Sequence, residues 1–210
     1  MRASGILLPV SSLPGKYGIG SFSEEAYKFV DFLKDSKQQY WQILPIGPTS
    51  YGDSPYQSFS TYAGNPYFIS LEELIEQKLL TEKECDKVDF GNKIDKVDYE
   101  KLYNGRFKLL KKAYKRSNIR EREEFKKFKD ENQYWLNDYA MFMAIKERFK
   151  GQSFDNWAED IKLRWGYSME YYQNELKEEI EFYEFVQYEF YRQWYKLKKY
   201  ANDNGVKIII

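Results

Sequence analysis

The chain of 210 residues contains no histidine and only one cysteine, Cys85. The absence of histidine excludes Ser-His-Asp and Cys-His-Asn catalytic systems within the chain, and it excludes zinc sites with histidine ligands. A single cysteine cannot form an internal disulfide or a paired-cysteine redox motif, so Cys85 is most simply an incidental thiol. Several common classes of nucleophilic, zinc-dependent and redox enzyme are therefore excluded.

The chain also lacks an excess of charge of either sign, since 33 Lys and Arg residues balance 33 Asp and Glu residues. This balance gives no electrostatic reason to expect a nucleic acid or an anionic membrane as partner. No apolar run is long enough to span a bilayer. The short run after Arg2 is interrupted at Ser11–Gly15 before it resembles a secretory signal. We therefore expect a soluble, cytoplasmic protein.

Proline and glycine are scarce, with 6 and 12 residues, but they stiffen the stretch from Ser50 to Pro66, which Pro48 precedes. Because proline fixes φ and glycine adopts conformations that other residues avoid, this stretch is predicted to be a shaped loop. Its aromatic residues are Tyr51, Tyr56, Phe59 and Tyr62. The short polar residues between them are Ser54, Gln57, Ser58, Ser60 and Asn65. Flat rings beside hydrogen-bonding side chains suit a sugar ligand; the alternative is a surface loop whose tyrosines cover the core.

The residues before this loop follow a strand-helix-strand pattern. Gly5–Val10 is predicted to be a strand that is buried on both faces. Ser21 and Glu24 have the spacing of a capping box, which predicts a helix ending near Asp35 and Ser36. Gln39–Pro45 is predicted to be the second strand. Such a unit forms a parallel sheet, and ligands of parallel sheets bind at the carboxyl ends of the strands, where the loop lies.

The rest of the chain is predicted to be mainly helical until its last residues. Short helices are expected around Leu71–Leu79 and from Thr81. Aromatic-rich helices are expected between Val97 and Glu175. Their rings either fill contacts between helices or form a binding face. A long helix with an apolar stripe ends at Asn204-Gly205 and leads into a third strand, Val206–Ile210.

This pattern predicts an α/β fold in which three strands of a parallel sheet are interrupted by a helical insertion. A complete eight-stranded barrel takes about 250 residues, so we expect the chain to be the N-terminal part of a larger barrel enzyme. The expected division is 1–70 for the first two strands, first helix and loop, 71–175 for the helical insertion, and 176–210 for the last helix and third strand.

Several segments together resemble amylomaltase, the bacterial 4-α-glucanotransferase or disproportionating enzyme of glycoside hydrolase family 77. The segments that carry the resemblance are Gly5–Gly20, Tyr40–Thr49, Tyr51–Ser60, Ala63–Pro66, Trp135–Ala140 and Gln193-Trp194 with the strand that follows. The Gly-Asp-Ser-Pro-Tyr-Gln block at residues 52–57 is long and specific. The resemblance covers the whole chain.

The resemblance implies a (β/α)8 TIM barrel that transfers α-1,4-glucan segments between maltooligosaccharides or starch with retention of configuration. Retention requires two carboxyl groups about 5–5.5 Å apart. In the family these groups lie on later strands, beyond Ile210, so we expect no catalytic residue in this chain. No cofactor and no metal are implied, because two carboxylates suffice for the chemistry.

The resemblance also implies that this chain contributes substrate binding through Tyr51, Ser54 and Tyr56. Asp53 is a candidate for a catalytic acid, but its place between Gly52 and Ser54 favours an Asx-turn that braces the loop. Gln57 and Asn65 are expected to brace the loop, and Trp135 and Trp194 to lie in the core. The expected partners are α-1,4-glucans, maltooligosaccharides and glucose as acceptor.

Two alternatives remain open at this point. The chain could be a glucan-binding module without chemistry, which would depend on Tyr51 and Tyr56. It could also be a helical interaction protein that docks a partner through residues 97–175. The sequence does not determine oligomeric state, preferred glucan length or cyclisation activity.

Overall fold

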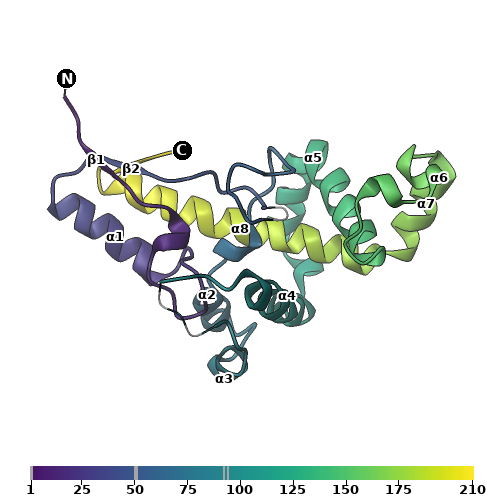
Figure 1. Ribbon diagram of the computed structural model, residues 1–210, viewed down its shortest axis with the longest axis horizontal. Helices are drawn as coiled ribbons and strands as arrows, with labels where there is room; N and C mark the ends of the chain where they lie inside the picture. Colours follow the sequence, from purple (N-terminus) through teal and green to yellow (C-terminus); the bar gives the residue numbers. More distant parts are fainter. Residues whose placement is uncertain (1, 50–51, 92, 94) are drawn as a thin grey trace. The chain divides into compact units, whose positions relative to one another are not determined.

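The computed structural model describes residues 2–49, 52–91, 93 and 95–210, and its contacts divide the chain into two compact units (Figure 1). The first unit comprises Met1–Ser117 with Glu189–Ile210, and the second comprises Asn118–Tyr188. The first unit therefore holds the sheet and the loop that follows its second strand. The second unit is helical.

The sheet of the first unit has three strands, β1 (Gly5–Leu7), β2 (Tyr40–Gln42) and β3 (Lys207–Ile209). They pair in the order β1-β2-β3, and both pairs are parallel. The amide of Leu8 donates to the carbonyl of Gln42, and the amide of Ile43 donates to that of Ile209. These bonds carry the pairing one residue past the carboxyl ends of β1 and β2. The predicted parallel sheet of three strands is confirmed, with shorter strands than expected.

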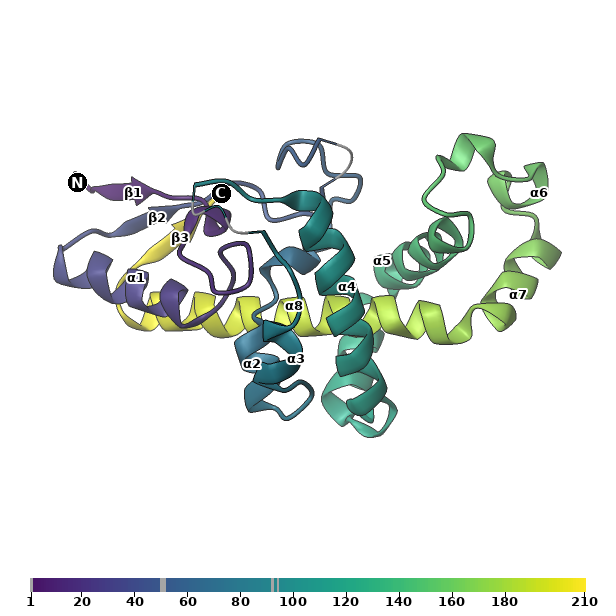
Figure 2. The same ribbon diagram turned by 60° about the horizontal axis from the view of Figure 1, so that its bottom comes forward.

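One face of this sheet is covered by helix α1 (Glu24–Asp35) and the last part of α8 (Lys177–Asp203) (Figure 2). Trp41 of β2 is fully buried, its ring packs edge-on against Phe29 of α1, and its indole N–H donates to the carbonyl of Leu8 at 2.8 Å. Leu7 of β1, in contrast, is 56% exposed. The prediction that the first strand is buried on both faces is therefore wrong, because the described residues leave more than half of Leu7 exposed.

Helix α1 begins later than predicted. Its N-cap is Ser23, and the expected capping box between Ser21 and Glu24 does not form. The amide of Phe22 instead donates to the carbonyl of Phe68 at 2.9 Å, and the Phe22 ring is buried. This tertiary contact keeps the backbone before Ser23 out of the helix. The predicted end is confirmed, since α1 stops at Asp35 with Ser36 as its C-cap.

Three helices of the first unit follow the loop, and their caps explain where they begin. They are α2 (Leu71–Glu76), α3 (Glu82–Asp86) and α4 (Tyr99–Arg116). Ser70 caps α2, Asp98 caps α4, and Thr81 forms a reciprocal capping box with Glu84 at the start of α3. The start predicted at Thr81 is confirmed. Two short 3-10 helices, Val10–Ser12 and Pro66–Phe68, lie in the connections.

Arg106 of α4 is buried without an acidic hydrogen-bond partner. Its guanidinium donates instead to the carbonyls of Tyr17 and Ile69. Burial lowers the pKa of Arg106 to about 10, so the group stays charged at neutral pH. A buried cation that bonds carbonyls fixes the backbone that carries them. The segments around Tyr17 and Ile69 are therefore held to α4.

The second unit contains α5 (Glu123–Arg148), α6 (Glu159–Lys162), α7 (Gly166–Glu175) and the first residues of α8. Two 3-10 helices, Ile119–Glu121 and Phe154–Asn156, connect them. Buried α5 residues include Phe125 and Trp135, both at most 7% exposed. The core position predicted for Trp135 is confirmed, whereas other aromatic residues of this unit lie on its surface.

Helix α8 carries the predicted apolar stripe. Its buried members include Val186, Phe190, Trp194, Leu197 and Ala201. The helix ends at Asp203, and Gly205 follows with φ +77°, a conformation that favours glycine. The predicted stripe, helix end and core position of Trp194 are all confirmed.

Two contacts of α8 hold the loop side of the first unit in place. The first is steric: the ring of Phe190 lies directly against Gly64, so a Cβ at residue 64 would overlap the ring. Phe190 also packs edge-on against Phe22 with centroids 5.3 Å apart. The chain at Gly64 thus approaches α8 as closely as a backbone without a side chain permits.

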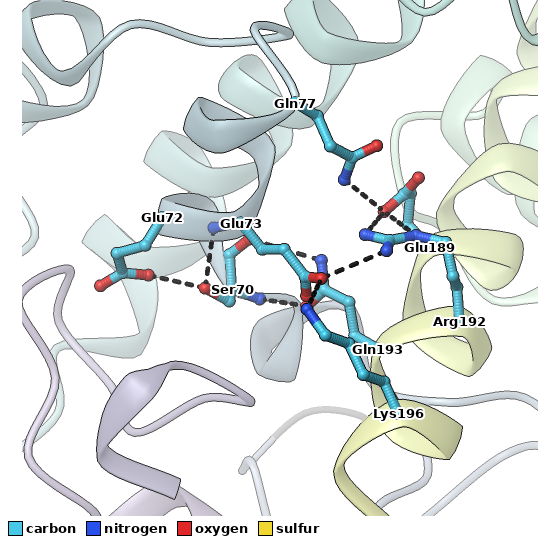
Figure 3. A network of polar contacts seen from close by, with 8 residues as sticks. All are labelled: Ser70, Glu72, Glu73, Gln77, Glu189, Arg192, Gln193 and Lys196. Carbon is cyan, nitrogen blue, oxygen red and sulfur yellow. Dashed lines mark hydrogen bonds and ion pairs between the residues drawn. The ribbon is translucent and has the colours of Figure 1, made fainter. Parts of the chain in front are cut away.

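The second contact is a polar network between α2 and α8 (Figure 3). The buried Gln193 side chain accepts from the amide of Ser70 at 2.7 Å. Glu73 of α2 pairs with Arg192 at 3.2 Å and with Lys196 at 2.6 Å. Arg192 also pairs with Glu189, whose side chain is fully buried, at 2.9 Å. Arg192 is therefore the cation that joins both carboxylates.

We expect Gly64→Ala to lower the free energy of unfolding by about 1–3 kcal/mol, because the added methyl must displace the Phe190 ring. Urea unfolding followed by circular dichroism measures the change. In a Phe190→Leu background, Gly64→Ala is expected to lower the free energy of unfolding by less than it does in the parent. The smaller leucine side chain leaves room for the methyl. Equal losses from Gly64→Ala in both backgrounds would contradict the contact.

We expect Arg192→Met to destabilise the protein by about 3–5 kcal/mol, because it leaves the buried Glu189 carboxylate without its cation. Lys196→Met is the matched control, since Lys196 pairs with the same Glu73 but is 57% exposed and should cost at most ~1 kcal/mol. Both values come from denaturant unfolding. Equal losses of unfolding free energy in Arg192→Met and Lys196→Met would contradict the argument that the buried Glu189 carboxylate depends on Arg192.

Candidate functional site

The candidate site lies just past the carboxyl ends of β1 and β2. It is built around the post-β2 loop, which we define as residues 44–66, with residues 50–51 outside the described part. A small cavity of about 40 Å³ lies at its base. The lining comes from the segment after β1 (Pro9, Val10, Ser11), from the loop (Leu44, Pro45, Ile46, Thr49, Asp53, Pro55, Asn65) and from Ile19, Tyr67, Phe68 and Tyr99. Parallel α/β folds place ligands at this position.

Short polar side chains brace the loop from within. The Ser58 hydroxyl donates to the carbonyl of Ser60 at 2.8 Å, and the Ser60 hydroxyl accepts from the amide of Ala63 at 3.0 Å. Asn65 is buried; its side chain accepts from the amide of Tyr67, and its own amide donates to the carbonyl of Ile46. The bracing role predicted for Asn65 is confirmed. Most of the polar residues between the rings therefore shape the loop.

Asp53 also acts as a brace, but not in the predicted form. Its backbone has φ +54°, and its carboxylate accepts from the hydroxyl of Thr49 at 3.2 Å. An Asx-turn would instead bond a backbone amide two residues on. The carboxylate thus ties two points of the loop together through a side chain.

The structure brings Ser54 and Tyr56 together in one exposed turn. The amide of Gln57 donates to the carbonyl of Ser54 at 3.0 Å, and the amide of Tyr56 lies 3.4 Å from the Ser54 hydroxyl oxygen, which accepts from it. The Tyr56 side chain is 73% exposed. An exposed ring on a braced turn is available to a ligand. Tyr51, the third predicted binding residue, lies outside the described residues.

Two tyrosines that the sequence did not single out complete the cavity. Tyr67 follows the loop and Tyr99 begins α4, and their rings lie 6.1 Å apart. Burial, with a smaller contribution from the Asp53 carboxylate, raises the pKa of both phenols, so both stay neutral hydrogen-bonding groups. Tyr99 lies 46 residues after Asp53, and no local pattern in the sequence connects them.

The described residues offer little for metal or thiol chemistry. They contain no group of three or more Cys, Asp or Glu side chains that could hold a metal ion. Cys85 is fully buried in α3, and burial raises the pKa of its thiol to about 11, which disfavours the reactive thiolate. In the same described ranges, no helix has the length and apolar character needed to cross a membrane.

Comparison with known proteins gives consistent matches over nearly the whole chain. The family model described as 4-alpha-glucanotransferase (glycoside hydrolase family 77) matches residues 8–210. The 4-alpha-glucanotransferase of Clostridium butyricum is 50% identical over 200 residues, which is 95% of this chain and 41% of that protein. The chloroplastic/amyloplastic 4-alpha-glucanotransferase of Arabidopsis thaliana is 34% identical over 99% of this chain and 36% of its own length.

A solved structure agrees with the sequence matches. Amylomaltase from Streptococcus agalactiae in complex with acarbose superposes with a TM-score of 0.92 at 42% identity, over 99% of this chain and 42% of that chain. The chain thus spans about two fifths of the length of these bacterial relatives. The family model covers far more than half of the chain, and the chain therefore belongs to the 4-alpha-glucanotransferase family.

Proposed function

We propose that this chain forms the N-terminal, substrate-binding part of a 4-α-glucanotransferase that passes α-1,4-glucan segments between maltooligosaccharides or starch. The observation that carries the proposal is the exposed Tyr56 ring beside Ser54, on a braced loop past the carboxyl ends of two parallel strands. The family match supports an α-glucan as the ligand proposed for this ring. Tyr51, on the same loop, is proposed as a further glucan contact.

The fold proposed for the whole protein is a (β/α)8 barrel with a helical insertion between early strands. The three parallel strands and the exposed Leu7 support it, because further strands and helices would cover such a sheet. In this proposal, residues 1–70 supply the first two strands and the loop, 71–175 the insertion, and 176–210 the last helix and third strand.

The proposed reaction is a retaining double displacement, in which one carboxyl group acts as nucleophile and a second as acid and base. We place both groups beyond residue 210, and we assign no catalytic role to an acidic residue of this chain. The residues of this chain would bind and position the substrate. The Tyr56 ring would stack on a glucose unit, and the Ser54 hydroxyl would bond sugar hydroxyls beside it. A stacked sugar also displaces water from the reacting centre, which favours transfer over hydrolysis.

The proposed partners are α-1,4-glucans and maltooligosaccharides, with glucose as an acceptor. The related amylomaltase in complex with acarbose supports an oligosaccharide ligand. We also propose a cytoplasmic location, which the single buried cysteine supports. The alternative, a glucan-binding module without chemistry, would show the same exposed Tyr56 ring.

In a protein that continues this chain to the length of its relatives, we expect Tyr56→Ala to lower kcat/KM for transfer from maltotriose about tenfold, which corresponds to ~1.4 kcal/mol. Tyr56→Phe keeps the ring and should stay within about threefold of the parent. Glucose release from maltotriose, followed over time, measures both.

Phe32→Ala is the matched control, because Phe32 is an exposed ring on α1 and does not line the cavity at the loop. It should leave transfer unchanged. If the longer protein binds maltoheptaose but releases no glucose from maltotriose, the binding-module alternative replaces the transferase. Full activity of Tyr56→Ala would remove the role proposed for the ring.

A further inference from the structure

The second unit exposes a compact set of aromatic rings that the proposed active site does not use. Trp165, Tyr167 and Tyr171 are 45%, 65% and 58% exposed, and they lie within seven consecutive residues at and after the start of α7. We call these rings, with Glu170 and Asn174, the ring face. Exposed aromatic residues gathered in this way mark binding surfaces more often than single exposed residues do.

The ring face is held by its own scaffold within the second unit. The amide of Trp165 donates to the carbonyl of Asp160 at 2.8 Å, and the Asp160 side chain accepts from the Ser168 hydroxyl at 2.5 Å. Arg164, with φ +57°, pairs with Asp138 of α5 at 2.6 Å. These bonds restrain the backbone on both sides of Trp165. A ligand that stacks on these rings would not need to order the segment first, and such preorganisation favours binding.

The arrangement on α7 alternates rings with hydrogen-bonding groups. Tyr167 and Tyr171 are four residues apart and share one side of the helix, together with the exposed Glu170 and Asn174. The Trp165 and Tyr167 rings lie 5.9 Å apart at an angle of 56°. Among the described residues, no side chain bonds the Trp165 indole N–H or the Tyr167 and Tyr171 hydroxyls. These tips are open to solvent and to a ligand.

We propose that the ring face is an accessory binding surface for an α-1,4-glucan chain. A sugar has apolar C–H faces that stack on rings and hydroxyl edges that bond amides, carboxylates and phenols, and the ring face presents both kinds of group side by side. The identity of the ligand rests on the proposed function, because a glucanotransferase acts on long α-1,4-glucans. The surface would hold glucose units of the polymer other than those that react.

The composition of the ring face favours a sugar over a second copy of the chain. The core of a protein interface is depleted of Lys, Glu and Asp, whereas these rings have Lys162 before them and Glu170 and Glu175 among or after them. One exposed aliphatic residue, Leu163, adjoins the rings at 57% exposure. Leu163 therefore separates the two interpretations, since a protein partner would use it and a glucan would not.

The test is affinity electrophoresis of the chain in native gels that contain soluble amylose. The background is the loop variant, which carries both Tyr51→Ala and Tyr56→Ala, so that the post-β2 loop contributes little. We expect amylose to retard the loop variant. Adding Trp165→Ala and Tyr167→Ala should weaken binding at least fivefold, and adding Leu163→Ala should change it less than twofold. Circular dichroism and urea unfolding confirm that each variant is folded.

Retardation of the loop variant that survives loss of Trp165 and Tyr167, or no retardation of the loop variant, overturns the ring face as a glucan site. Concentration-dependent dimers in sedimentation that Leu163→Ala disperses also overturn it, in favour of a second copy. The proposed function fails separately: ring-dependent retardation without glucose release by the longer protein contradicts the transferase and leaves the ring face standing. Glucose release without ring-dependent retardation contradicts the ring face alone.

Discussion

The contact between Gly64 and the ring of Phe190 is the constraint on which the candidate site depends. It leaves no space for a side chain at residue 64, so the post-β2 loop returns to helix α8 at one fixed point. Nearby, Gln193 accepts from the amide of Ser70, and Arg192 pairs with both Glu73 and the buried Glu189. A helix that carries apolar and polar anchors on neighbouring turns can hold a loop in one conformation. The exposed turn of Ser54 and Tyr56 lies on the loop that these contacts anchor.

Much of the fold could be predicted because its signals are local. The spacing of apolar residues along α8, the glycine after it and the short β-type runs each depend on neighbours in the sequence, and all three are confirmed. Two errors in the fold arose where tertiary surroundings decided the outcome. The amide of Phe22 bonds the carbonyl of Phe68, and the capping box at Ser21 does not form. The exposure of Leu7 depends on what covers the sheet. Neither effect is visible in the local sequence pattern.

The candidate site divides in the same way. Ser54 and Tyr56 lie within one specific block of sequence, so the motif identifies them, although their contact with a glucan stays a proposal. Tyr67 and Tyr99 come together only through the packing of α4, and no spacing predicts that meeting. In the second unit, aromatic content alone does not distinguish the buried Trp135 from the exposed Trp165. The buried residue lies within a long amphipathic helix, and the exposed one begins a helix whose outer side is also aromatic.

The central claim is that the Tyr56 ring, held on the braced loop, touches a bound glucan. Its most direct test is an NMR titration of the ¹³C-tyrosine-labelled protein with maltoheptaose, in which the Tyr56 signal is assigned by its loss in Tyr56→Phe. The account predicts a saturable shift of the Tyr56 ring signal, while that of the buried Tyr139 stays in place. Saturable binding of maltoheptaose with an unmoved Tyr56 signal would contradict it.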